Sequence, residues 1–370
     1  MGKYGKKNHV SLNPLDANIC LLGLPKIGKT TIMKQIAEKL VGDNYLFLEM
    51  YRENGAKYIE DIVYENVPDW ETFVDIIDDI VENKTTDYPD LKVVFIDTID
   101  NAIQLAEQES IRLWNSENPS KYTNAINAAW GGFQKGQDKA LDLLQEQWFR
   151  LREVGVAFSL IGHVKQTTIT DPITLDTYQQ ITSDISQRYF NQIKKNIDLI
   201  GIAYIDREIT KEKTGKKNVV TGKETVVNKV TSEARKIKFR DSNYCVDSGG
   251  RMSQIVEEID FDADEFIKAM RDALEAEVKK SGKSIEDRHK EDSAAAEKRA
   301  EQIAAVEESN KKEKELNEIK AKIKDFCIAN KGKAAALKPL LALAKEKGYE
   351  NPMAVDDIDV AKEILALTAA

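Results

Sequence analysis

The segment from Gly23 to Thr30 constrains the fold of this chain more than any other feature of its sequence. Its residues, GLPKIGKT, match the phosphate-binding pattern G-x-x-x-x-G-K-[ST]. An apolar run at residues 18–25 ends in this segment, and a run with helical spacing follows it. Strand, glycine-containing loop and helix in this order are the context in which such a motif binds phosphate. An ordinary glycine-rich turn is the alternative interpretation.

The residue types of the loop suit a bound nucleoside triphosphate with Mg²⁺. Glycines let backbone N–H groups turn toward phosphate oxygens, and the helix N-terminus adds the positive end of its dipole. Lys29 is predicted to reach the β- and γ-phosphates, and the Thr30 hydroxyl to bind Mg²⁺. No base-reading N-K-x-D motif occurs, which favours ATP over GTP. The residues expected to contact the nucleotide are Gly23, Leu24, Pro25, Lys26, Ile27, Gly28, Lys29, Thr30 and Thr31.

Apolar runs alternate with amphipathic segments over the first 260 residues. Strands are predicted at residues 18–25, 45–49, 92–97, 154–162, 198–204 and 234–240, and helices at residues 70–81 and 138–153. A hairpin rich in Lys, Thr and Gly is expected between the last two strands. This alternation predicts an α/β fold whose mostly parallel sheet is covered by helices on both faces.

Two carboxylates end predicted strands of this sheet. Asp97 closes the run VVFID, where it would hold Mg²⁺ at the carboxyl edge; a helix N-cap is the alternative role. Glu49 closes the run YLFLE and is predicted to orient the attacking water as a general base. An exposed charge at a strand end is the alternative for Glu49, with Glu53 as a competitor.

Polar residues near two later strands are further candidates. His163 and Lys165 follow the strand VAFSLIG, where a side chain can lie near the γ-phosphate and report the nucleotide state; a local hydrogen-bonding role is the alternative. Lys238 and Arg240 alternate in the run RKIKFR, so their side chains are expected on one face. Such a pair can stabilise the γ-phosphate in a neighbouring subunit, or it can be a solvated or DNA-contacting edge.

The polar, Thr-rich segment 166–192 is a candidate loop for single-stranded DNA. Its aromatic residues Tyr178, Tyr189 and Phe190 can stack on bases, although packing of Tyr189 and Phe190 in the core is an equal alternative. The segment Trp130–Phe133 (WGGF) is interpreted as a packing element before the helix at residues 138–153, and a binding role is the alternative.

Composition divides the chain into a globular core and a charged tail. Residues 280–324 are dominated by Glu, Lys and Ala, which predicts a solvated helix or tether, and apolar residues return at 323–370 as a small helical appendage. The expected domains are a basic arm at 1–17, a core at 18–260, a charged helical linker at 261–322 and a helical domain at 323–370. Three scattered cysteines and the absence of an apolar run of about 20 residues predict a cytoplasmic protein outside the membrane.

The motifs taken together, over residues 15–260, resemble the phage-encoded RecA-like P-loop ATPases, the AAA-type phage nucleotide-binding proteins. The resemblance rests on Gly28–Thr31 (GKTT), the IDT at residues 96–98, the WGG at residues 130–132, the G-H-V-K at residues 162–165 and the K-x-R at residues 238–240. It implies a RecA-like core, rings or filaments with ATP at subunit boundaries, and single-stranded DNA on loops facing the axis. His163 departs from the amide often found at that position, and the DNA loop is poor in basic residues.

The resemblance implies an ATPase that acts on single-stranded DNA in phage recombination or strand annealing inside an infected bacterial cell. DNA stimulation of hydrolysis is expected. Two alternatives remain open at this stage: a helicase or packaging motor of the same sheet type, and a nucleotide-dependent adaptor. In the adaptor, the C-terminal tail would recruit a partner such as a single-strand-binding protein.

Overall fold

The computed structural model describes residues 11–170, 175–217, 224–242, 244–245, 247–280, 284–330 and 334–368. The chain forms two compact units. One comprises residues 1–78 and 89–297, and the other residues 79–88 and 298–370. Lys3, Lys6 and Lys7 of the predicted basic arm lie outside the described residues.

A ten-stranded sheet, most of it parallel, forms the centre of the first unit. Its strand order is β10-β8-β7-β1-β5-β4-β2-β3, with β6 paired to β5 and β9 paired to β7. Parallel pairing joins β1, β2, β3, β4, β5 and β7. Antiparallel pairing adds β6, β8, β9 and β10 to the sheet. The strands are β1 Ile19–Gly23, β2 Tyr45–Met50, β3 Tyr64–Val67, β4 Val93–Asp97, β5 Ala157–Thr170, β6 Thr177–Ser183, β7 Leu199–Lys217, β8 Glu224–Lys238, β9 Gly249–Gly250 and β10 Glu258–Asp260.

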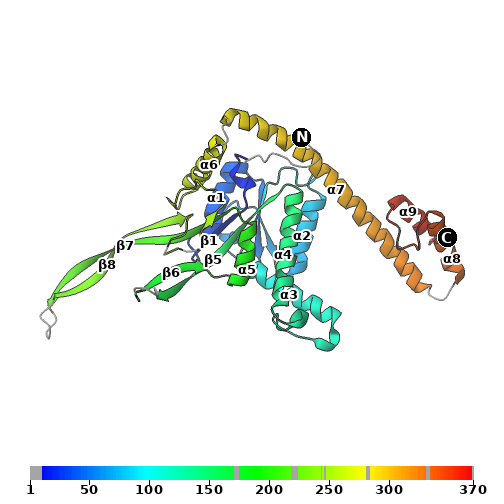
Figure 1. Ribbon diagram of the computed structural model, residues 1–370, viewed down its shortest axis with the longest axis horizontal. Helices are drawn as coiled ribbons and strands as arrows, with labels where there is room; N and C mark the ends of the chain where they lie inside the picture. The colour runs from blue at the N-terminus through cyan, green and yellow to red at the C-terminus, as the bar shows by residue number, and fades with distance from the viewer. Residues whose placement is uncertain are drawn as a thin grey trace. The chain divides into compact units, whose positions relative to one another are not determined.

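Helices cover both faces of this sheet, as the alternating pattern predicted (Figure 1). The α-helices are α1 Lys29–Val41, α2 Trp70–Glu82, α3 Ile99–Glu117, α4 Lys135–Glu153, α5 Gln187–Ile193, α6 Ala263–Lys280, α7 Ile285–Ala329, α8 Ala334–Glu346 and α9 Ile358–Ala366. Strand β1 is buried along its whole length, which explains why its sequence, ICLLG, is apolar without alternation. The fold is therefore an α/β core built on a mostly parallel sheet, as the sequence predicted.

One face of the sheet packs against α1 and α6. Their apolar side chains form a single cluster with alternate residues of the strands, such as Leu21, Phe95 and Phe239. On the other face, Trp148 of α4 stacks on Phe158 of β5 with ring centroids 5.1 Å apart. Because the face of a strand residue alternates, Glu49 and Asp97 share the α1 face with Phe47 and Phe95.

Helix α6 belongs to the core, whereas the sequence predicted its residues to be part of the charged linker at 261–322. Phe266 and Met270 are fully buried, and both pack in the α1 cluster. The aromatic rings of Phe239 and Phe266 lie 5.4 Å apart, which ties α6 to the end of β8. The apolar face of this helix therefore extends the core past residue 260, and the first compact unit ends at Glu297.

Two antiparallel ribbons continue from strands on either side of β1. The first joins β5 to β6, with Val164–Thr170 paired to Thr177–Ser183. The second joins β7 to β8 and extends away from the helical layers (Figure 1). Both leave the sheet at its carboxyl edge, because Gly23 at the end of β1 is level with His163 of β5 and Ala203 of β7.

The segment expected to bind DNA is divided between the first ribbon and helix α5. Tyr189 and Phe190 of α5 are buried, and the Tyr189 hydroxyl donates to Glu107 Oε1 at 2.6 Å. These two rings are therefore core residues, and the prediction that they stack on bases is wrong. Tyr178 of β6 is 36% exposed, so it is the ring of this segment that remains accessible.

The loop before α4 packs through Trp130 and exposes Phe133. Trp130 Nε1 donates to the backbone oxygen and the hydroxyl of Ser110, both at 3.1 Å, and its ring lies 5.8 Å from that of Trp114. The Phe133 side chain is 93% exposed. Trp130 thus has the packing role expected from the sequence.

The second unit has an apolar cluster of its own. Buried residues of α7, α8 and α9 meet there, among them Ile323, Leu340 and Ile364. Most of the charged segment of the tail lies in α7, which is one helix of 45 residues. Over the part of the chain that the structure describes, no helix is long and apolar enough to cross a membrane.

Candidate nucleotide-binding site

The loop between β1 and α1 has the backbone shape of an anion-binding nest. Lys26 and Gly28 both adopt positive φ, 63° and 106°, which turns successive N–H groups inward. Gly28 is the N-cap of α1, and because glycine has no side chain, it cannot accept hydrogen bonds from the first amides of the helix. The N–H groups of the first turn of α1 are therefore directed at the loop, where a phosphate can accept them.

Gly23 allows the loop to lie close to the neighbouring strand. A Cβ atom at this position would be 2.9 Å from Ala203 Cβ and 3.0 Å from the Ala203 carbonyl oxygen, so only glycine fits. At Gly28 the positive φ imposes the same requirement. Both glycines of the motif are thus explained by the geometry of the loop.

Lys29 holds the loop together from inside. Its Nζ donates to the backbone oxygens of Gly23 and Leu24, both at 3.1 Å, and its side chain is buried. Burial lowers the pKa of this ammonium, and the negative charges of Asp97, Asp100 and Glu53 act in the opposite direction. Further negative charge near the ammonium would offset the cost of its burial. Phosphate oxygens bound in the loop would supply that charge.

A hydrogen bond joins the loop helix to the carboxylate of β4. Thr30 Oγ1 donates to Asp97 Oδ2 at 2.6 Å. The N-cap of α3 is Thr98, so Asp97 is not a helix cap. Burial raises the pKa of Asp97 to about 6; the Thr30 hydrogen bond and Lys29 lower it, and Glu53 and Glu49 raise it further.

The residues around Thr30 and Asp97 fit a Mg²⁺ ion. A hydroxyl and a carboxylate that already meet are hard oxygen ligands of the kind Mg²⁺ prefers. The buried Thr98 Oγ1, next in sequence to Asp97, has no hydrogen-bond partner among the described residues and is a further polar atom that a metal-bound water can contact. Among the described residues no group of three or more His, Cys, Asp or Glu could hold a metal alone, so phosphate oxygens and water would complete the coordination.

Glu49 lies on the strand next to Asp97 and is level with it. It is buried, and its Oε1 accepts the backbone N–H of Ala56 at 2.8 Å. The interpretation of Glu49 as an exposed strand-end charge is therefore wrong. The hydrogen bond orients the carboxylate at the same edge of the sheet as the loop and Asp97.

His163 is positioned by a residue that the motifs did not reveal. Both its backbone N–H and its Nδ1 lie near Asp100 Oδ2, at 3.1 and 3.2 Å. Asp100 is in the first turn of α3. This contact links the end of β5 to the segment that follows Asp97. Lys165 lies farther along β5, half exposed, with Nζ 3.5 Å from Asp184 Oδ1.

Lys238 and Arg240 lie away from the chain's own P-loop. Lys238 Nζ is 2.9 Å from Glu257 Oε1, and Arg240 Nη2 donates to the backbone oxygen of Ser253 at 3.0 Å. Lys238 is level with Ile202 and therefore one residue below the edge marked by Ala203. Their face is opposite that of Ile237 and Phe239, which pack toward α1.

Arg235, three residues before Lys238, is the cation of this run that reaches the loop. Its Nη1 donates to the Ile27 backbone oxygen at 3.1 Å. Its guanidinium lies over the ring of Phe261, 5.5 Å from the centroid. The period of two in RKIKFR could have assigned Arg235 to the α1 face with Ile237, but only the strand order shows that this face meets the P-loop.

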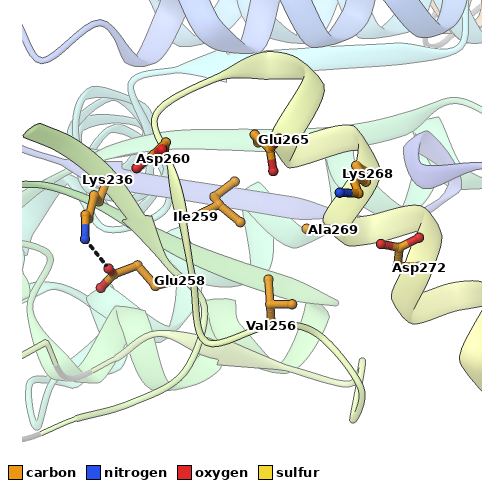
Figure 2. Close-up of a pocket in the computed structure, with 9 residues that line it drawn as sticks. All are labelled: Lys236, Val256, Glu258, Ile259, Asp260, Glu265, Lys268, Ala269 and Asp272. Atoms are coloured by element: carbon orange, nitrogen blue, oxygen red, sulfur yellow. Dashed lines mark hydrogen bonds and ion pairs between the residues drawn. The ribbon is translucent and has the colours of Figure 1, made fainter.

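A pocket of about 370 Å³ lies at the edge of the sheet, and its lining excludes a triphosphate. Figure 2 shows its side chains coming from β8, the segment around β10, and α6. Four are carboxylates and two are lysines: Glu258, Asp260, Glu265, Asp272, Lys236 and Lys268. The Lys236 ammonium is already paired with Glu258 at 2.8 Å and Asp206 at 3.2 Å. The excess of carboxylates repels phosphate.

Comparison with known proteins shows the family of this chain. The family described as "AAA domain" matches residues 15–234, more than half of the chain. No curated protein matches the sequence. A KaiC-like protein from the hyperthermophilic archaeon Pyrococcus horikoshii OT3 is among the solved structures with similarity, at 14% identity and a TM-score of 0.28. That match covers 62% of this chain and 80% of that protein.

Proposed function

Because the chain belongs to the family of AAA domains and is a P-loop ATPase, we propose that it uses ATP and Mg²⁺ to act on single-stranded DNA in phage recombination or strand annealing. The observation that carries the ATP and Mg²⁺ part of the proposal is the hydrogen bond between Thr30 and Asp97 beside the loop. It places a hydroxyl, a carboxylate and a phosphate nest at one point of the sheet edge.

The residues of the site divide the work of phosphoryl transfer among them. The first-turn amides of α1 and the Lys29 ammonium bind and orient the phosphates. Thr30 and Asp97 would hold Mg²⁺, which would supply positive charge to stabilise the transferring phosphoryl group. Glu49 accepts a proton from the attacking water, and its hydrogen bond from Ala56 keeps the carboxylate oriented. His163, held by Asp100, senses the terminal phosphate from β5.

Single-stranded DNA is proposed to bind the ribbon of β5 and β6. This ribbon begins at Val164, directly after His163, which is level with the last residue of the P-loop strand. A change at the γ-phosphate is therefore transmitted along one continuous strand. Tyr178 supplies an accessible ring for base stacking, and the neighbouring Thr and Gln residues supply polar contacts. ATP binding orders this ribbon for DNA, and hydrolysis releases it.

The rate of ATP hydrolysis with and without single-stranded DNA tests the proposal. DNA is expected to raise the rate in the wild-type chain. Tyr178→Ala is expected to lower DNA affinity and stimulation while leaving the basal rate unchanged, because Tyr178 lies outside the P-loop. An equal rate with and without DNA would overturn the DNA role and leave the ATPase assignment intact.

We also propose that several copies assemble with ATP at their boundaries. Lys238 and Arg240 do not approach the chain's own loop, so any contact of theirs with phosphate has to be made in a neighbouring copy. Arg240→Ala and Asp97→Asn subunits are each expected to be inactive alone. Mixing them should restore activity, because one interface then combines an intact Arg240 with an intact Asp97. An Arg240→Ala chain with full activity would refute the role.

An adaptor function is the second candidate. The apolar cluster of α7, α8 and α9 gives the C-terminal helices a core of their own, which supports a docking role toward a partner such as a single-strand-binding protein. Removing residues 298–370 is expected to abolish partner binding and to preserve ATP hydrolysis. Retention of partner binding by the shortened chain would contradict the adaptor role.

A further inference from the structure

The P-loop, Thr30 and Asp97 offer contacts for the triphosphate of a nucleotide but none for its base. Thr30 and Asp97 place the metal and the terminal phosphate on the β4 side of β1. The base is at the opposite end of a nucleotide from its γ-phosphate. It therefore has to lie on the other side of β1, toward β7 and β8.

Two planar side chains flank the P-loop on that side. Arg235 comes from β8, and Phe261 directly follows the end of β10 at Asp260. A Cβ atom at Gly28 would lie 3.4 Å from Phe261 Cε1 and 3.5 Å from Arg235 Nη1. Both side chains thus lie close to Gly28, within contact distance of where a side chain at that position would begin. Arg235 is exposed and Phe261 is only partly buried. The guanidinium lies over the ring, 5.5 Å from its centroid, so the two side chains together form one surface that a ligand can reach.

The two side chains are held in place by the core and by the loop. The Phe261 backbone N–H donates to the Arg235 oxygen at 2.9 Å, which joins the two residues across neighbouring strands. Phe261 packs against the α1 and α6 cluster. Arg235 Nη1 donates to the Ile27 oxygen at 3.1 Å, so its guanidinium is anchored to the P-loop itself. A ring and a guanidinium beside the phosphate nest are therefore held in position by contacts within the chain.

We propose that Phe261 and Arg235 form the base subsite of the nucleotide site, in which a purine stacks against the pair. This inference rests on the proposed function, because it names the part of ATP that the loop does not hold. Aromatic rings and guanidinium planes both stack on base faces. Every base has such a face, so stacking binds adenine and guanine alike. The subsite raises affinity for a nucleoside triphosphate over inorganic tripolyphosphate, and it does not by itself select ATP over GTP.

Binding of ATP, GTP and inorganic tripolyphosphate to the full chain with Mg²⁺ tests the assignment. Phe261→Leu keeps an apolar side chain and removes the ring. It is expected to weaken ATP and GTP by roughly 5- to 150-fold, the range of one base stack, and to leave tripolyphosphate affinity unchanged. Phe261→Tyr retains the ring and is expected to retain the preference for ATP over tripolyphosphate. Phe149→Leu makes the matched change at a 45% exposed ring on α4 and should alter none of the three affinities.

Two results would overturn the assignment. One is a Phe261→Leu chain that binds ATP as tightly as the wild type. The other is an equal loss of ATP and tripolyphosphate affinity, because that pattern means the substitution has damaged the P-loop. A wild-type chain that binds neither ligand overturns the proposed function, and this inference with it. A wild-type chain that binds tripolyphosphate as tightly as ATP overturns the base subsite alone.

Discussion

Acidification from about pH 7.5 to about pH 5 is expected to remove most of the contribution of Mg²⁺ to nucleotide binding. The cause is Asp97, whose burial raises the pKa of its carboxyl group to about 6. Mg²⁺ binds the carboxylate and not the protonated acid, so proton and metal compete for the same oxygen atoms. The competition begins near pH 6, where an exposed aspartate would remain ionised.

The pKa values set the size of the effect. One pH unit below a pKa of about 6, about one carboxyl group in eleven remains ionised, so metal-dependent affinity falls roughly tenfold by pH 5. With the ordinary value of 3.8, about 94% would still be ionised at that pH and the loss would be under about 10%. The two cases are easily separated by measurement.

The assay is the ratio of ATP dissociation constants with Mg²⁺ and with a chelator, measured by calorimetry across this pH range. Phosphate groups also titrate near pH 6. Asp97→Asn is the control, because the nucleotide titrates identically in that variant while residue 97 does not. A wild-type ratio that stays constant down to pH 5, or one that falls equally in Asp97→Asn, would refute the argument.

Three further predictions concern single residues of the site. Lys29→Ala is expected to lose ATP binding or turnover, since the ammonium is the buried cation of the loop; normal hydrolysis by this variant would refute the site. Asp97→Asn is expected to stabilise the nucleotide-free chain above pH 6 by at most about 3 kcal/mol, measured by denaturant unfolding. Asn is expected to stabilise the chain because a carboxyl group with a raised pKa lowers the free energy of unfolding as pH rises from about 4 to about 6. An unchanged free energy of unfolding in Asp97→Asn, or an equal gain at pH 4, would contradict this prediction. Glu49→Gln should lower single-turnover hydrolysis by about 10²- to 10⁴-fold with ATP affinity retained, and a loss of affinity alone would exclude the role of base.

Much of the nucleotide site follows from local patterns. Gly23, Lys29 and Thr30 are recognised by spacing, because the shape of the loop depends on a few consecutive residues. Asp97 and Glu49 are found because each ends an apolar run, and parallel strands end at one edge of a sheet. The hydrogen bond between Thr30 and Asp97 and the register of Glu49 with Asp97 agree with that expectation.

Other parts depend on contacts between distant segments and were not visible in the sequence. Asp100 orients His163 across 63 residues, although neither forms a motif with the other. The sequence left open whether Tyr189 and Phe190 stack on bases or pack in the core, and the structure buries both. In each case the side-chain environment is set by an element remote in the chain.

The sequence by itself determined the P-loop, the alternating α/β core and the carboxylates at its edge. Those features follow from short-range rules: backbone turns that need glycine, and the periods of strand and helix. Only the tertiary structure decided which cation of RKIKFR meets the loop. Arg235, Lys238 and Arg240 have similar chemistry, and their roles differ because strand order places the face of Arg235 beside Gly28. The same packing placed Phe261 there and moved α6 into the core, because burial of apolar area depends on neighbours that no local pattern specifies.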